Sequence, residues 1–414
     1  MSTPRVVSFE RISVVVFSAG AVSVLATGFR LPDQDAFATA RGEAFAATAD
    51  NPSAIYYNPA GIGQLRGHQL SGGAYGLNIQ SRFESPTGAQ FDNSKDLHAI
   101  PQVFYVYGAE SLPFSFGLGA YSPYGLSSEW PETTGFRTVA LEGRLTYFTL
   151  NPVAAWRVTP RLFVAAGATI NYAELDFTQG LTPIPGNDYF NLRGEDLDVG
   201  FNLGGLWKVN EQFTVGLAYR SATTMELEGK SELIVHSPVP PFLPGPVAMT
   251  QDASARLPLP FNLVFGVSYR PTPKWNFEVN ADYTDWSRLN TVTVKQAPLP
   301  DAGLVLNWEP SWYYEFGATR YLEKGWWVSL GYIFNENSVP DASYSPLVYD
   351  LDRHFISAGL GVEHDHLRLG LAYQFGYGPT RTVAGSAPSA AGQTADGKYD
   401  FLSHAVIVTA GWKF

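Results

Sequence analysis

Residues 275–283 read Trp-Asn-Phe-Glu-Val-Asn-Ala-Asp-Tyr, with apolar side chains at the odd positions and polar side chains at the even ones. Successive side chains on a β-strand point to opposite faces, so this alternation predicts a strand with one apolar and one polar face. The pattern recurs in residues 162–172, 326–334 and 366–375. The chain is therefore predicted to be built largely from two-faced strands.

The connections between these strands come in two kinds. Six short turns are expected at 108–113, 158–161, 209–212, 271–274, 322–325 and 363–366. Seven long connections rich in Pro, Gly, Ser and Asp are expected near 82–97, 123–138, 180–189, 232–250, 288–306, 336–351 and 377–399. This arrangement predicts a 14-stranded, antiparallel, up-and-down transmembrane β-barrel, because an even strand number with short turns on one rim is typical of outer-membrane barrels. A soluble β-sandwich also alternates and is the alternative.

The composition narrows the class of protein. The 414 residues are 45% hydrophobic, 14% aromatic and 16% charged, whereas a soluble domain averages about 25% charged residues. The chain contains no cysteine, which excludes a disulfide framework, a thiolate metal site and a cysteine nucleophile. A net charge of -11 provides no basic surface for nucleic acid.

The beginning of the chain predicts export. Arg5 and Arg11 precede an apolar stretch, Ile12–Leu25, that ends in Val-Leu-Ala, and this order describes a secretory signal peptide. A membrane anchor is the alternative, but the stretch is shorter than the roughly 20 residues of a spanning helix. We expect a signal peptide over 1–26, an N-terminal hatch over 27–66 and a barrel over 67–414, in the outer membrane of a Gram-negative bacterium.

Residues 27–66 do not alternate and precede the first expected strand. Small residues over 36–50 predict helical turns, and Asn58-Pro59 is a turn signal. A segment of about 40 residues fits inside a barrel of this size as a plug. Many lumen-facing positions, such as those in 403–409, are small or apolar. They indicate either a lumen suited to apolar ligands or close packing against the plug, and the sequence leaves both open.

The C-terminus is also amphipathic. Val406, Val408, Trp412 and Phe414 share one face of the last expected strand, and the sequence ends on Phe414. The last strand of a closed barrel must pair with the first, so a strand that runs to the end of the sequence is expected. We assign Phe414 to barrel assembly, with the barrel-assembly machinery as its partner.

Several segments resemble the hatch of the FadL/TodX family of outer-membrane transporters for long-chain fatty acids and other hydrophobic compounds. They are Thr27-Gly-Phe-Arg-Leu31, Ala40-Arg-Gly-Glu-Ala-Phe-Ala46, Ala49-Asp-Asn-Pro-Ser53 and Asn58-Pro-Ala-Gly61. The Asn-Pro-Ala triplet is the hallmark of that family. Residues 116–126 and 281–288 are similar to further family segments, so the resemblance spans the mature chain.

This resemblance implies a transport mechanism. Extracellular loops would capture a hydrophobic ligand, a site inside the barrel would hold it, and hatch movement would release it sideways through a kinked third strand. Phe29 is then the expected ligand-binding residue, and Asn58, Pro59 and Ala60 the expected gating element. Gly117 and Gly119 are the expected strand kink, although either glycine could equally serve barrel packing. The expected partners are a hydrophobic small molecule and outer-membrane lipid. The expected oligomeric state is a monomer.

Two other functions are the alternatives. A general diffusion porin or adhesion barrel fits the same strand pattern. A lipid hydrolase would need a Ser–His pair, but Ser403 and His404 are adjacent and point to opposite faces of a strand. His364-Asp365-His366 lies in an expected turn and is interpreted as a solvated turn. We therefore predict no enzyme activity, catalytic residue, metal ligand or cofactor.

A residue for a carboxylate headgroup is not assigned by the sequence. Arg144, Arg193 and Arg368 are candidates only because their expected parity directs them into the lumen.

Overall fold

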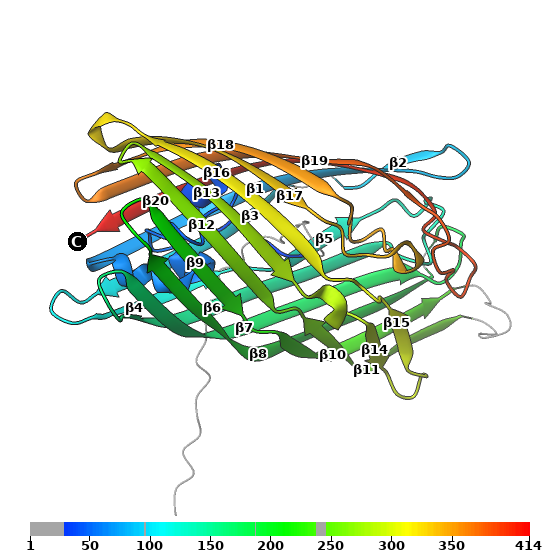
Figure 1. The fold of residues 1–414 in the computed structure, drawn as a ribbon. Coiled ribbons are helices and arrows are strands. Elements are labelled where there is room, and N and C mark those ends of the chain that lie inside the picture. The colour runs from blue at the N-terminus through cyan, green and yellow to red at the C-terminus, as the bar shows by residue number, and fades with distance from the viewer. Residues whose placement is uncertain (1–28, 95–96, 187, 237–245) are drawn as a thin grey trace, which may run out of the picture.

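The computed structural model describes residues 29–94, 97–186, 188–236 and 246–414. The expected signal peptide lies outside these residues. One antiparallel sheet curls until β1 (Gly67–Glu84) pairs with β20 (Gly397–Lys413), from Gln69 opposite Lys413 to Glu84 opposite Lys398. The sheet is thus a closed barrel, as Figure 1 shows from the side.

The remaining strands follow in chain order. They are β2 (Gln90–Asp92), β3 (Leu97–Gly108), β4 (Phe114–Tyr121), β5 (Gly125–Glu129), β6 (Glu142–Arg157), β7 (Leu162–Gly180), β8 (Tyr189–Lys208), β9 (Phe213–Arg220), β10 (Thr223–Val235), β11 (Val247–Leu259), β12 (Asn262–Thr272), β13 (Trp275–Thr284), β14 (Thr291–Lys295), β15 (Ala302–Val305), β16 (Ser311–Tyr321), β17 (Trp326–Asn335), β18 (Arg353–His364) and β19 (Leu367–Val383). The helices are α1 (Ala36–Ala40), α2 (Ala54–Tyr57), η1 (Pro59–Gln64), η2 (Trp286–Arg288), η3 (Glu323–Gly325) and η4 (Asp341–Ser343).

Interrupted strands explain why the described residues hold more segments than a 14-strand barrel needs. β4 and β5 both pair with β6, and β9 and β10 both pair with β8. Likewise, β2 continues into β3, β11 into β12, β13 into β14 and β15 into β16. Joined in this way, the segments give the 14 antiparallel strands predicted from the sequence.

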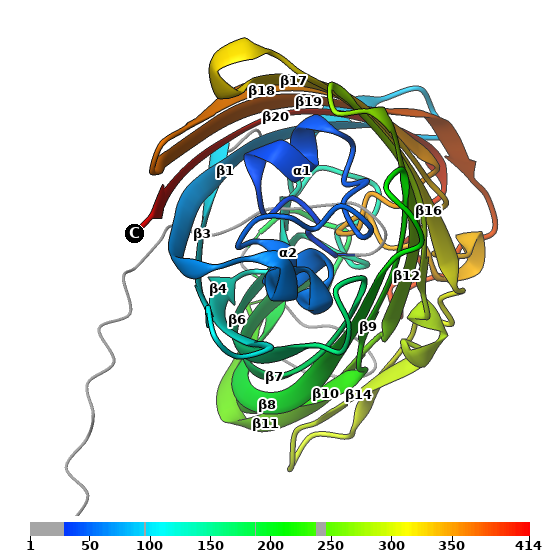
Figure 2. The ribbon, with the colours of Figure 1, turned by 60° about the vertical axis from the view of Figure 1, so that its left-hand side comes forward.

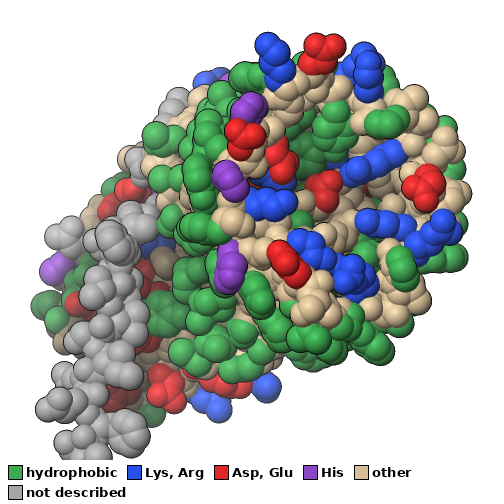
Figure 3. Space-filling view, turned by 90° about the vertical axis from the view of Figure 1, so that its left-hand side faces the viewer, with side chains coloured by type: hydrophobic (Ala, Val, Ile, Leu, Met, Phe, Trp, Pro, Cys, Tyr) green, Lys and Arg blue, Asp and Glu red, His purple; other side chains and the backbone are tan. Residues whose placement is uncertain are grey.

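The two faces of each strand lie in different surroundings. In β3, exposed and buried residues alternate without exception. The outward side chains are large and apolar, such as Phe201, Leu330 and Ile356. Figure 3, which views the barrel along its axis from the end with the short turns, shows hydrophobic side chains around the flank and charged ones across the end. This distribution is that of a barrel whose flank lies in lipid.

Residues 29–66 lie inside the barrel, where Figure 2 shows α1 and α2 enclosed by the strands. α1 is short and built of small residues, and the Asp35 carboxylate caps it by accepting from the amides of Phe37 and Ala38. Gly42 and Glu43 follow with φ near +60°, which reverses the chain. None of the helices in the described ranges is long and apolar enough to cross a membrane.

The opposite half of the barrel is filled by its own loops. The loop after β5 contributes Trp130 and Phe136, which pack on each other with ring centroids 5.4 Å apart. The Trp130 indole donates to the Pro346 carbonyl in the loop after β17, at 2.8 Å, and packs on Tyr349. These aromatic side chains are buried. The lumen is therefore filled from both ends, by the hatch at one end and by loops at the other.

Small residues in the wall allow the hatch to approach the barrel backbone. A Cβ added to Gly331 in β17 would lie 2.6 Å from Gly42 Cα, and one added to Gly42 would lie 2.6 Å from the Tyr332 amide nitrogen. The Gly42 amide also donates to Ser357 Oγ at 3.1 Å. A larger residue at 331 has backbone in its way, so the hatch must move.

We predict that Gly331→Val displaces the hatch while the barrel still forms. Arg41 is fully buried in the docked hatch, so trypsin cleavage after Arg41 reports displacement, and heat-modifiable electrophoretic mobility reports an intact barrel. Gly76→Val is the matched control, because the nearest atom to an added Cβ there is 3.6 Å away. Equal resistance of wild type and Gly331→Val to trypsin would contradict the prediction.

Candidate functional site

The beginning of the hatch lies across a break in the barrel wall. The third barrel strand stops after β4 and resumes at β5, leaving residues 122–124 between them. Arg30 forms an isolated antiparallel bridge with Tyr124. The Leu31 amide donates to the Pro123 carbonyl at 2.8 Å, and the Gly125 amide donates to the Phe29 carbonyl at 2.9 Å. Residues 29–31 thus satisfy backbone groups that the broken strand leaves unpaired.

Phe29 also fills a cluster of aromatic rings. Its ring centroid lies 5.0 Å from that of Trp286 and 5.9 Å from those of Tyr124 and Trp308. We call these four residues the aromatic cluster. Trp286 lies in the connection between β13 and β14, and Trp308 between β15 and β16. The indole Nε1 atoms of both are buried without a hydrogen-bond partner among the described residues, so within this part of the chain the cluster offers apolar surface and two unused donors.

An ion pair fixes the same segment to the far wall. Arg30 Nη2 lies 2.6 Å from Asp282 Oδ2, and both side chains are buried. Arg30 also donates to Thr284 Oγ1 at 3.1 Å. A buried charge is tolerated only when it is paired and hydrogen-bonded. The position of Arg30, and with it that of Phe29, therefore depends on β13.

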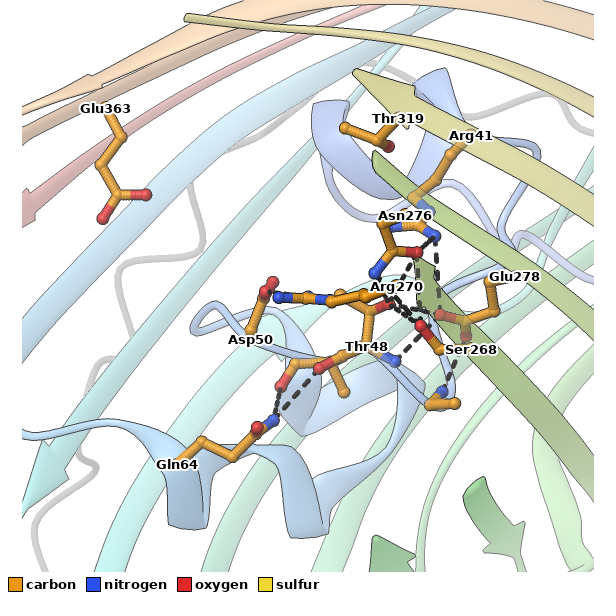
Figure 4. A network of polar contacts seen from close by, with 12 residues as sticks. Arg41, Thr48, Asp50, Gln64, Ser268, Arg270, Asn276, Glu278, Thr319 and Glu363 are labelled. Carbon is orange, nitrogen blue, oxygen red and sulfur yellow. Dashed lines mark hydrogen bonds and ion pairs between the residues drawn. The ribbon is translucent and has the colours of Figure 1, made fainter. Parts of the chain in front are cut away.

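A second polar network holds the middle of the hatch, and Figure 4 shows it from close by. Glu278 of β13 accepts from the amides of Ala47 and Thr48, at 2.7 and 3.0 Å, and from the Thr48 hydroxyl. Arg41 donates to Asn276 at 2.7 Å and lies 3.6 Å from Glu278. One carboxylate thus compensates a buried cation and binds two consecutive hatch amides.

The Asn58-Pro59-Ala60 triplet joins three parts of the site. The Asn58 side-chain amide donates to the Ala46 carbonyl within the hatch at 2.7 Å and to the Gly205 carbonyl of β8 at 3.0 Å. Its oxygen accepts from the Ala60 amide at 3.2 Å, which caps η1. Pro59 occupies the first position of η1, where its missing N–H leaves no bond unmade. The triplet connects two hatch segments to the wall.

Of the other expected residues, the two glycines lie in ordinary strand positions and Phe414 directly follows the end of β20. Gly117 and Gly119 lie in the paired part of β4, opposite Val106 and Phe104 of β3, and the break in the strand comes after them, at 122–124. An added Cβ at either glycine would lie 2.8 Å from the hatch residue Ile55. The exposed Phe414 donates its amide to the His68 carbonyl at 2.9 Å.

The prediction that Arg144 and Arg193 point into the lumen is wrong. Arg144 and Arg193 are exposed on the outer face, and Arg193 pairs with Glu174 there. The register of these strands places their buried neighbours in the lumen instead. Arg368 does face inward and pairs with Glu363 at 2.8 Å.

Two hatch carboxyls, those of Asp33 and Glu43, lie close together, and no ion pair joins either of them to a cation in the described part of the chain. Both Glu43 oxygens are buried and have no hydrogen-bond partner among the described residues. Burial, followed by the neighbouring Asp33 carboxyl, raises the pKa of Glu43 well above its ordinary value. Burial also raises the pKa of Asp33, which accepts from Gln374 of β19 at 3.0 Å. The uncharged, protonated forms of Glu43 and Asp33 are thus favoured when the hatch lies docked inside the barrel, as in this structure.

A closed 14-strand barrel with an apolar flank and a lumen filled by an N-terminal hatch defines a class: a transport protein of the outer membrane. The chain belongs to the outer membrane protein transport protein family (OMPP1/FadL/TodX), whose model matches residues 17–414. This membership makes it a transport protein rather than an enzyme and confirms the expected family and outer-membrane location.

Individual relatives are distant. The long-chain fatty acid transport protein of Escherichia coli O6:H1 (strain CFT073) is 23% identical over 287 residues, a match that spans 66% of this chain and 61% of that relative. The crystal structure of a Pseudomonas aeruginosa FadL homologue superposes with a TM-score of 0.83 at 19% identity, covering 94% of this chain and all of that one. The Ralstonia pickettii toluene transporter TbuX gives a TM-score of 0.72 at 16% identity, covering 96% of this chain and all of that one.

Sequence reasoning missed the residues that attach the hatch. Glu278 and Asp282 were recognised only as the polar face of 275–283, and Arg30 only as part of a motif. A signal was nevertheless present, because charged residues on the face opposite Phe277 and Val279 must lie in the lumen. The sequence could not show which hatch residues pair with Glu278 and Asp282, since Arg30 and Asp282, for example, are far apart in the chain.

We predict that Glu278→Ala weakens hatch docking by about 3–5 kcal/mol, because it leaves Arg41 buried without its carboxylate. Hydrogen exchange of residues 36–50 measures the effect. The control is Glu226→Ala, which removes an exposed partner of Arg256 and should cost no more than about 1 kcal/mol. Unchanged exchange in Glu278→Ala would show that this network does not hold the hatch.

A second prediction concerns pH. A carboxyl whose pKa is higher in the docked hatch than in water binds its proton more tightly when docked. Docking is therefore strongest below the ordinary carboxyl pKa of about 4 and weakens as pH rises through the raised pKa of Glu43. Hydrogen exchange of the hatch, corrected for its intrinsic rate, should increase from pH 5 to pH 8. The increase should be smaller in Glu43→Gln and unchanged in Glu226→Gln; an equal increase in all three proteins would refute the assignment.

Proposed function

We propose that this protein takes up hydrophobic compounds, long-chain fatty acids or hydrocarbons, across the outer membrane, and releases them sideways through the break in the third strand. The observation that carries the proposal is that residues 29–31 hydrogen-bond across that break. A hatch that completes the wall in its resting position opens the wall when it moves. Phe29 is the proposed ligand-contacting residue, and a ligand would displace it from the aromatic cluster.

The attachment of the hatch favours movement. Its polar contacts to β13 and β8 are specific, and small wall residues such as Gly331 let it lie against the barrel backbone. We propose that Asn58, Pro59 and Ala60 form the gating element, because the Asn58 side chain joins a second hatch segment and β8 through the Ala46 and Gly205 carbonyls. The roles expected for Gly117 and Gly119 in a strand kink, and for Phe414 in assembly as a monomer by the barrel-assembly machinery, stay predictions.

A general diffusion porin is the second candidate, and the filled lumen argues against it. The hatch occupies one half of the barrel, and aromatic side chains of the loops occupy the other. A steady, large ion conductance in a planar bilayer would favour the porin.

The proposed route can be blocked by a disulfide, since the chain has no cysteine of its own. Arg30 and Tyr124 face each other in an antiparallel bridge, where Cα atoms lie about 4.5–5.5 Å apart, a span that a disulfide fits. In cells carrying Arg30→Cys/Tyr124→Cys, oxidation should abolish uptake of oleate and toluene above the level of cells without the gene. A reductant should restore uptake.

The control is Lys230→Cys/Asp252→Cys, which joins facing residues of β10 and β11 away from the break and should leave uptake unchanged when oxidised. Uptake by the oxidised Arg30/Tyr124 variant at the rate of its reduced form would refute lateral release at this break. Wild-type cells that take up neither compound faster than cells without the gene would refute the transport function itself.

A further inference from the structure

Oxygen atoms of several hatch side chains gather around α1. Asp33 precedes this helix and Glu43 follows it, and their carboxyls lie close together. The hydroxyl of Thr39, which belongs to the helix itself, lies beside both carboxyls. We call these three residues the oxygen cluster.

The oxygens of the cluster are buried and largely unpaired. Thr39 is 1% exposed, and its Oγ1 atom has no hydrogen-bond partner among the described residues. The same holds for both carboxyl oxygens of Glu43, which is 2% exposed. A buried polar group without a partner costs about 1–3 kcal/mol, and a charged one costs more. A ligand that these oxygens share would recover that cost.

The charge of the cluster is not balanced by the protein. Asp33 accepts from the side-chain amide of Gln374 in β19 at 3.0 Å, but this donor is neutral. The nearest arginines along the chain, Arg30 and Arg41, pair with carboxylates of β13 instead. Two carboxylates this close repel each other, and a cation between them removes the repulsion. The cluster therefore favours a cation shared by its two carboxyls.

The chemistry of the surroundings selects the kind of cation. Tyr57 lies beside Glu43, and Tyr75 of β1 lies beside Asp33, so the neighbouring groups are hydroxyls. Carboxyl and hydroxyl oxygens are ligands of hard cations, whereas thiolates and imidazoles select transition metals. Mg²⁺ demands a regular octahedron and keeps several waters, but Ca²⁺ accepts about six to eight oxygens in irregular geometry. An enclosed, irregular cluster of oxygens suits Ca²⁺ better.

Two cavities between the hatch and the wall border the cluster. Glu43 and Tyr57 line a cavity of about 460 Å³, and Asp33 and Tyr75 line another of about 350 Å³. Both carboxyls can therefore be reached by an ion, and the cavities have space for waters that complete its coordination.

We propose that Asp33, Thr39 and Glu43 bind one Ca²⁺ ion, which fixes the hatch in its docked position. The ion would join the segment before α1 to the turn after it, and Asp33 links both to Gln374 of β19. No group of three or more His, Cys, Asp or Glu side chains in the described ranges is placed to hold a metal ion. With two carboxylates, the dissociation constant should be about 10⁻⁴–10⁻³ M, as in extracellular calcium modules.

The test measures the binding of radioactive Ca²⁺ to the purified full-length protein by equilibrium dialysis at pH 7.5. Wild type should bind one equivalent of Ca²⁺ more than Glu43→Gln, which keeps the shape of the side chain and removes its charge. Asp33→Asn should lose the same equivalent. Binding to wild type should weaken at pH 5, because metal ligands must be deprotonated.

The control is Asp252→Asn, which changes an exposed carboxylate paired with Lys230 and should bind as many equivalents as wild type. Heat-modifiable electrophoretic mobility shows whether each variant has folded. Equal binding by wild type and a folded Glu43→Gln overturns the proposal.

A second measurement, on the wild type alone, decides the question if the variants do not fold. Ca²⁺ at about 5 mM, several-fold above the expected dissociation constant, should slow hydrogen exchange of residues 33–43 relative to EDTA. Exchange that does not respond to Ca²⁺ overturns the proposal. So does equal slowing by NaCl at the same ionic strength, because it would show screening of charge rather than a binding site.

Discussion

The absence of water in lipid is the constraint on which this structure depends. A strand in hydrocarbon cannot leave its amides and carbonyls unpaired, so the sheet closes between β1 and β20. The same constraint makes the break at 122–124 significant, because a gap in a closed wall exposes backbone groups. Residues 29–31 pair with those groups. The hatch is thus part of the wall as well as the plug of the lumen.

The way in which the hatch is held follows from the same low polarity. Hydrogen bonds and ion pairs in a closed lumen are strong when complete and costly when one partner is lost. Arg30 with Asp282 and Arg41 with Glu278 are complete in the docked position. In the hatch movement that we propose, these pairs would be exchanged for contacts with water, which would compensate the loss. Under that proposal, the polar pairs hold the hatch firmly and can form again when it returns.

Much of the fold could be predicted from the sequence, and less of the site. The alternation in 275–283 and the spacing of the turns depend only on neighbours in the chain, so they indicated strand number, strand faces and the position of the hatch. The parity expected for Arg144 and Arg193 was wrong, because a strand's inner face is set by its register against both neighbours. The sequence did not predict the break in the third strand at 122–124, because Pro123 is as compatible with a turn between two strands as with an interruption within one.

The sequence by itself determined that this is a two-faced barrel of 14 strands with a non-alternating segment before it, because periodicity is a local property. The tertiary structure alone decided which residues meet. Arg30 finds Asp282 and Tyr124 only when β13 and the broken third strand lie on the same lumen. It also decided that the carboxyls of Asp33 and Glu43 lie close together beside the Thr39 hydroxyl. Charge compensation in a closed lumen depends on distances across the barrel, and no local pattern encodes them.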